Sequence, residues 1–85
     1  MKAKVNEIIS STEDTVYLSN YSYDDALIGI TTDGRAVYDY DRMVTWLMAT
    51  QGFTEEEAME WVDYNTIRAL PYMGKKAPII MYQLE

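Results

Sequence analysis

The sequence of 85 residues predicts an α+β fold in which a small antiparallel sheet packs against two consecutive helices. The prediction depends on a hairpin signal at Asp33-Gly34 and on an apolar stripe with helical spacing that follows it directly. A second apolar run, near the C-terminus, supplies one further strand. Since no linker or repeat interrupts the chain, we expect one small domain over residues 1–85.

The N-terminal third gives mixed signals. Val5, Ile8 and Ile9 have helical spacing, which predicts a short helix over residues 3–10. Residues 15–18 have the composition of a strand, and residues 20–25 are rich in serine, asparagine and aspartate, which favour turns. We therefore expect a helix, one further strand and then a loop.

A β-hairpin is predicted over residues 26–39. Its outgoing half is rich in β-branched residues, and Asp33-Gly34 supplies the positive φ angles of a tight two-residue turn. Such a turn places Ile30 opposite Val37 and orients both toward the core.

Two other residues of the outgoing strand extend this prediction. Ile28 falls on the same face as Ile30, so we expect it to face the core as well. Gly29 has no side chain, and we interpret it as a place where another element packs closely.

The first helix is predicted over residues 40–51. Asp39 suits the N-cap position, Asp41 adds negative charge to the first turn, and Gly52 suits a left-handed C-terminal stop. The apolar residues fall at i, i+3, i+4, i+7 and i+8, which predicts a buried stripe. Its members are Tyr40, Met43, Val44, Leu47 and Met48.

The second helix is predicted over residues 55–70. Thr54 and Glu57 have the spacing of a capping box, and Pro71 should end the helix. A turn at residues 74–76 then leads to the last strand, at residues 78–83. The residues expected on the buried face of this helix are Ala58, Trp61, Val62 and Asn65.

Composition narrows the possible functions. Fourteen acidic residues against seven basic ones give a net charge of −7, which disfavours direct binding to DNA or RNA. No apolar run is long enough to span a membrane, and Lys2-Ala3-Lys4 is not followed by a signal-peptide core. Because the chain has no cysteine for disulfides, we expect a cytoplasmic protein.

Catalysis and metal binding are not expected. The chain has neither histidine nor cysteine, and such a small domain has little room for a substrate cleft, so we predict no enzyme and no cofactor. Four aspartates are candidate metal ligands, but none has calcium-loop spacing, and turns and helix caps account for them. They are Asp24, Asp25, Asp39 and Asp41.

Acidic and aromatic residues on the second helix point instead to binding of another protein. Eight tyrosines and two tryptophans exceed what a core of this size hides, and exposed rings beside carboxylates suit a basic partner. Two interpretations stay open: a surface for partner binding, or acids that merely solvate the helix and tyrosines that lie half-buried. Arg68 suits an internal salt bridge or a partner contact. The candidate partner-binding residues are Glu56, Glu60, Asp63, Tyr64, Arg68 and Tyr72.

Four blocks of the sequence also resemble those of a group of short, acidic, uncharacterised proteins of bacteria, phages and mobile elements. The blocks are TDGRAVYDYD (32–41), EAMEW (57–61), NTIRALPY (65–72) and APIIMY (77–82). The resemblance implies a mobile-element setting and assigns no activity or site residue. Some small acidic proteins of such settings inhibit host nucleases, and this analogy gives a second hypothesis, a nucleic-acid mimic that blocks a basic surface.

Overall fold

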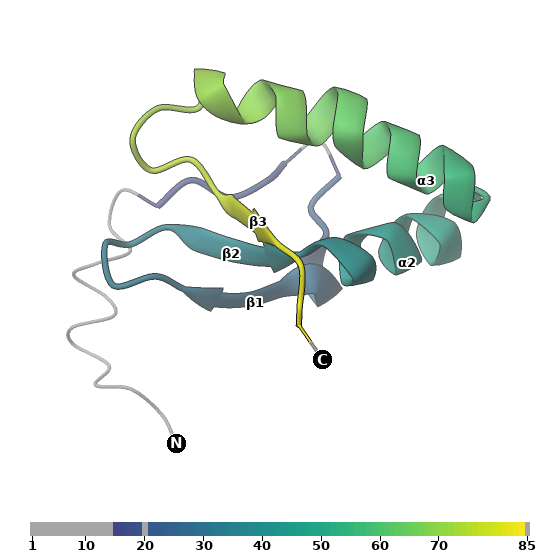
Figure 1. The fold of residues 1–85 in the computed structure, drawn as a ribbon, viewed down its shortest axis with the longest axis horizontal. Helices are drawn as coiled ribbons and strands as arrows, with labels where there is room; N and C mark the ends of the chain where they lie inside the picture. The colour runs from purple at the N-terminus through teal and green to yellow at the C-terminus, as the bar shows by residue number, and fades with distance from the viewer. Residues whose placement is uncertain (1–14, 20, 85) are drawn as a thin grey trace.

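The computed structural model describes residues 15–19 and 21–84, and it confirms the α+β class (Figure 1). Within this part of the chain a three-stranded sheet has the order β1-β2-β3. Figure 1 shows α2 continuing outward from the end of β2, and α3 turning back above the sheet. The helix predicted over residues 3–10 lies outside the described residues.

The hairpin joins β1 (Leu27–Ile30) to β2 (Ala36–Asp39). Its loop is longer than the predicted two-residue turn. Thr31 N donates to the Arg35 carbonyl at 2.8 Å, and Gly34 N donates to the Thr31 carbonyl at 2.9 Å. Gly34 has a φ of 83°, so the loop is a turn followed by one left-handed glycine, which is the usual three-residue hairpin connection.

The longer loop shifts the strand register by one residue. Ile30 lies opposite Ala36 rather than Val37. Because neighbouring residues of a strand point to opposite faces, Ala36 and Tyr38 are buried, while Val37 turns to the other face. The prediction that Val37 faces the core was therefore wrong.

A β-bulge in β1 explains the two remaining differences in the hairpin. The register shifts between Leu27 and Gly29, so Ile28 is an extra residue, and it is 42% exposed rather than in the core. A Cβ atom added at Gly29 would meet nothing within 4 Å. Gly29 thus accompanies a bulge and not the close approach of another element.

The third strand runs in the opposite sense to the prediction. β3 (Ile79–Met81) pairs with β2 in parallel, with Tyr38 beside Ile80, so the sheet is mixed and not antiparallel throughout. A parallel pair needs a long crossover connection. The two helices between β2 and β3 form that crossover, as Figure 1 shows.

Helix α2 (Tyr40–Gln51) has the predicted bounds. The Asp39 carboxylate accepts a hydrogen bond from Arg42 N at 3.2 Å, and Gly52 ends the helix with a φ of 70°. Tyr40, Met43, Val44 and Leu47 are buried as predicted. Met48, the fifth member of the predicted stripe, is exposed instead.

The second helix is one continuous helical stretch in which three types of helix follow one another. It consists of α3 (Glu55–Trp61), a π-helical turn η2 (Val62–Thr66) and a 3₁₀ helix η3 (Ile67–Tyr72). The predicted capping box is present, with Thr54 N donating to Glu57 Oε1 at 2.8 Å and Glu57 N donating to Thr54 Oγ1 at 3.1 Å. Pro71 lies inside η3 rather than after the helix. We call residues 55–72 the second helical stretch.

The π-helical turn changes which side chains of this stretch face inward. Ala58 and Val62 are buried as predicted, but Asn65 is exposed and Thr66 is buried in its place. A π turn holds more residues than an α turn, so it rotates the following side chains relative to the regular pattern. Asn65 is thereby turned outward, whereas Thr66, four residues after Val62, lies on the buried face with Ala58 and Val62 and was not predicted.

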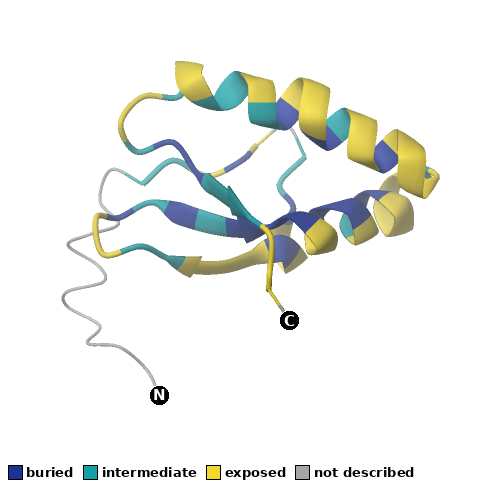
Figure 2. Cartoon of the chain, viewed as in Figure 1, coloured by how far each residue is buried: buried dark blue, intermediate teal, exposed yellow. Residues whose placement is uncertain are grey.

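The core lies between the sheet, α2, the second helical stretch and the segment that precedes β1 (Figure 2). That segment contains η1 (Asp24–Ala26), and residues 15–19 form no strand, contrary to the prediction. Leu18 is nevertheless buried, and its backbone N–H donates to Tyr38 Oη at 3.1 Å. No helix in the described part of the chain has the length and apolar character needed to cross a membrane.

Gly52 and Gly29 provide a matched test of the cost of a left-handed backbone conformation. A Cβ atom added at Gly52 or at Gly29 would meet nothing within 4 Å, but Gly52 alone of the two has a positive φ, 70°. We expect Gly52→Ala to lower the free energy of unfolding by about 1 kcal/mol, because only the left-handed conformation is strained. Gly29→Ala should raise it by about 0.5 kcal/mol. Urea denaturation measures both, and equal effects would contradict this account.

Candidate functional site

A buried aromatic cluster supports the second helical stretch from inside. Tyr23 is fully buried, and its ring centroid lies 5.4 Å from that of Trp46 and 6.4 Å from that of Tyr21. Tyr21 in turn lies 5.1 Å from Trp61. The cluster therefore connects the segment before β1 to both α2 and α3.

The Tyr23 hydroxyl has a buried partner. It forms a hydrogen bond of 3.0 Å with Thr66 Oγ1, a buried side chain at the end of the π-helical turn. Burial raises the pKa of Tyr23, because removal from water disfavours the charged phenolate. A satisfied hydroxyl explains how a tyrosine is tolerated at the centre of the core.

All six candidate partner-binding residues are exposed on the second helical stretch, as expected from its spacing. Five of them follow one another every fourth residue, and residues four apart are neighbours on a helix surface. Figure 2 shows the outward side of this stretch exposed along its length. We call the set the acidic aromatic surface: Glu56, Glu60, Asp63, Tyr64, Arg68 and Tyr72.

Two pairs of side chains are in contact at this surface. The Arg68 guanidinium carbon lies 5.7 Å from the centroid of the Tyr64 ring, a cation–π contact. Among the described residues Arg68 makes no ion pair within 4.0 Å, so the internal salt bridge is not formed. Asp63 accepts a hydrogen bond of 3.1 Å from the Tyr40 hydroxyl, which ties the stretch to the start of α2.

A groove borders the acidic aromatic surface on the side of the α2–α3 joint. It has a volume of about 400 Å³ and is lined by three aromatic rings, two carboxylates and one amide. We call it the Trp61 groove, and its residues are Phe53, Glu57, Glu60, Trp61, Tyr64 and Asn65. The Phe53 and Trp61 rings are 6.1 Å apart and inclined at 41°.

Sequence reasoning placed Glu60 and Tyr64 at the site but missed the rest of the Trp61 groove. It assigned Trp61 to the core, whereas the side chain is half-buried and borders both core and groove. Glu57, Glu60, Trp61 and Tyr64 have spacings of three and four residues, so helical periodicity could have grouped them. Phe53 joins them only through the angle between α2 and α3, which the sequence does not specify.

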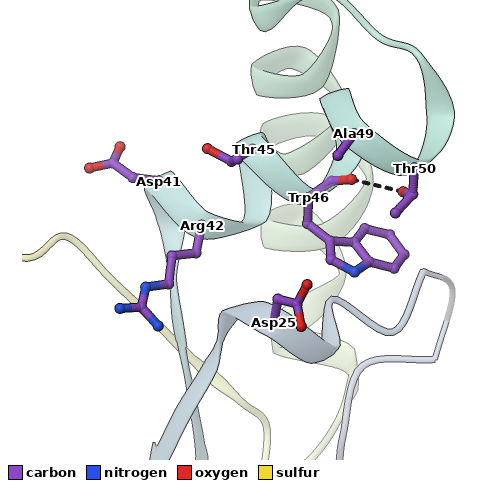
Figure 3. Close-up of a pocket in the computed structure, with 7 residues that line it drawn as sticks. All are labelled: Asp25, Asp41, Arg42, Thr45, Trp46, Ala49 and Thr50. Carbon is purple, nitrogen blue, oxygen red and sulfur yellow. Dashed lines mark hydrogen bonds between the residues drawn. The ribbon is translucent and has the colours of Figure 1, made fainter.

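A second hollow, of about 400 Å³, lies between η1 and the outer side of α2 (Figure 3). Trp46 and Asp25 face it, and Arg42 extends beside them from the first turn of α2. The Thr50 hydroxyl donates to the Trp46 carbonyl at 2.8 Å, a contact internal to the helix. This hollow combines one aromatic ring with charges of both signs.

The aspartates considered as metal ligands have other roles or lie apart. Asp39 caps α2, and Asp25 and Asp41 line the hollow of Figure 3. In residues 15–19 and 21–84, no group of three or more acidic side chains is arranged to hold a metal ion.

Comparison of the chain with protein families, with curated proteins and with solved structures gave no significant match. The resemblance to acidic proteins of phages and mobile elements thus stays a prediction.

The Tyr23–Thr66 hydrogen bond can be tested by a double-mutant cycle. Thr66→Val leaves the buried Tyr23 hydroxyl without its partner and should lower the free energy of unfolding by about 1–3 kcal/mol. Adding Tyr23→Phe removes that hydroxyl, so the double variant should lose less than the sum of the single variants. Strict additivity in denaturation experiments would show that the two groups do not interact.

Tyr40 provides a test based on pH. Desolvation by burial, followed by the hydrogen bond to the Asp63 carboxylate, raises the pKa of Tyr40 to about 12. Because the folded pKa exceeds the unfolded value of about 10, this contribution to stability is present below pH 10 and is lost as the pH rises toward 12. Asp63→Asn should lower the pKa of Tyr40, and absorbance titration of tyrosinate, with Tyr40→Phe identifying the signal, measures it. An unchanged pKa would contradict the role given to Asp63.

Proposed function

We propose that this chain is a non-enzymatic interaction module that binds a basic protein through the acidic aromatic surface. The observation that carries the proposal is the contrast between two groups of tyrosines. Tyr23 and Tyr38 are fully buried, whereas Tyr64 is 64% exposed and Tyr72 is 90% exposed on the same stretch as Glu56 and Glu60.

Physical chemistry supports binding at such a surface. Tyrosine rings supply a large contact area at a small entropic cost, and they are enriched at protein interfaces. Exposed carboxylates beside them raise the rate of encounter with a positively charged partner and repel acidic ones. The overall charge of −7 acts in the same direction.

Other features of the chain bear on where the module acts. The chain has no cysteine, and small secreted domains usually depend on disulfides. A cytoplasmic location is therefore part of the proposal.

The second candidate is a nucleic-acid mimic that occupies the basic groove of a nuclease or a DNA-binding protein. Glu56 and Glu60 are one helical turn apart, about 6 Å along the axis, which is close to the spacing of successive phosphates. Arg68, in contrast, places a positive charge on the same stretch, and a mimic of phosphates has no use for it. The interaction module therefore stays the preferred function.

Charge reversal tests the proposal. We expect Glu56→Lys combined with Glu60→Lys to weaken capture of the natural partner about tenfold, because two steering carboxylates become repulsive. The matched control is Asp24→Lys combined with Asp25→Lys, which changes the charge equally at exposed positions on η1. Affinity capture from cells that encode the chain, followed by titration of the purified partner, gives the measurement.

Tyrosine truncation and salt separate the two candidates. For the interaction module, Tyr64→Ala or Tyr72→Ala should cost about 1–2 kcal/mol of binding energy, and added salt should weaken binding less than these truncations do. For the mimic, affinity should fall steeply with salt and depend mainly on the carboxylates. If neither the charge reversal at Glu56 and Glu60 nor either tyrosine truncation weakens binding of the partner, both candidates are refuted.

A further inference from the structure

We propose that the Trp61 groove receives an arginine side chain of the partner. This inference rests on the proposed function, because it specifies which chemical group of a basic protein the acidic aromatic surface recognises. It concerns the groove alone, and it can be tested on the isolated chain without the natural partner.

The shape of the groove suits a side chain that is flat at its tip. Its volume of about 400 Å³ lies within the range of small-ligand sites in proteins. Trp61 lines the groove and packs against two other rings, with Phe53 at 6.1 Å and Tyr21 at 5.1 Å between ring centroids. An aromatic wall held in this way loses little conformational freedom when a ligand binds.

The charge of the lining selects a cation. The faces of aromatic rings carry negative electrostatic potential, and three rings border the groove: Phe53, Trp61 and Tyr64. Two carboxylates add formal negative charge, and among residues 15–19 and 21–84 neither a lysine nor an arginine lines the groove. Glu57 already accepts a hydrogen bond from Thr54 N, so Glu60 is the carboxylate that we assign to the ligand.

Arginine suits this lining better than lysine does. A guanidinium group is planar and weakly hydrated, so it stacks on rings and pairs with a carboxylate at the same time, whereas an ammonium group holds its water more strongly. A guanidinium–ring contact of this kind already exists within the chain, because the Arg68 guanidinium lies over the Tyr64 ring at 5.7 Å. Arg68 also adds positive charge beside the groove and should therefore weaken the binding of a second cation.

The hollow of Figure 3 is the competing site for a cation. It has one aromatic residue, Trp46, and two carboxylates, Asp25 and Asp41. Arg42 also lines it, so an incoming guanidinium meets a like charge there. The two tryptophans of the chain thus lie in different hollows, and each reports on its own site.

The test titrates the isolated protein with N-acetyl-arginine-N-methylamide and follows nitrogen–proton correlation spectra. The indole signal of Trp61 and the amide signals of Glu60 and Tyr64 should shift in a saturable way, while the indole signal of Trp46 should shift little. The neutral analogue N-acetyl-citrulline-N-methylamide, which has nearly the same shape, should leave all of these signals in place.

Variants of three exposed residues sharpen the result. Glu60→Gln should weaken binding of the arginine probe about threefold, as expected for one carboxylate near a cation at a partly exposed site. Glu55→Gln, on the same helix but outside the groove, should leave binding unchanged. Arg68→Gln should strengthen binding about twofold, because a neighbouring positive charge is removed.

Several results would overturn the proposal. These are shifts confined to the Trp46 indole, equal shifts with the citrulline analogue, or equal weakening by Glu60→Gln and Glu55→Gln. Binding of N-acetyl-lysine-N-methylamide as tight as that of the arginine probe would overturn the assignment to arginine. If the arginine probe fails while charge reversal at Glu56 and Glu60 still releases the partner, the proposed function stands and the groove proposal alone is refuted.

Discussion

The position of Tyr23 is the constraint on which the rest of the structure depends. Its ring packs against Trp46 of α2, and its hydroxyl reaches Thr66, so one side chain joins the segment before β1 to both helical layers. Tyr23 has a φ of 50°, an uncommon backbone conformation for a residue with a side chain. Thr66 lies at the end of the π-helical turn η2, on the same buried face as Ala58 and Val62, and so supplies the partner of the Tyr23 hydroxyl.

The candidate site depends on this core in a direct way. Tyr21 packs edge-on against Tyr23 and also lies beside Trp61, so the inner wall of the Trp61 groove is supported by the buried cluster. The outer residues Glu60 and Tyr64 are carried by the same helical turns that bury Val62. The exposed Glu60 and Tyr64 side chains thus project from a base of packed aromatic rings.

The sequence predicted the features that depend on neighbouring residues. Asp39 as N-cap, Gly52 as C-terminal stop and the capping box of Thr54 were all correct, because each is decided by local hydrogen bonds or by one backbone angle. The features that it missed depend on tertiary contacts or on a difference of one residue. The hairpin loop gained a residue and so turned Val37 away from the core, and the mixed sheet required knowing how the two helices return the chain. For the site, helical spacing predicted the exposed residues, but the pairing of Phe53 with Trp61 arises from the interhelical angle.

The parallel pairing of β3 with β2 has a consequence for synthesis on the ribosome. The hairpin and α2 are neighbours in sequence and assemble through short loops, whereas β3 emerges only after both helices have been made. During that interval the edge of β2 that later bonds to β3 exposes unpaired backbone groups. A β1–β2 hairpin without β3 therefore has an open hydrogen-bonding edge, the kind of edge at which strands of other chains can pair.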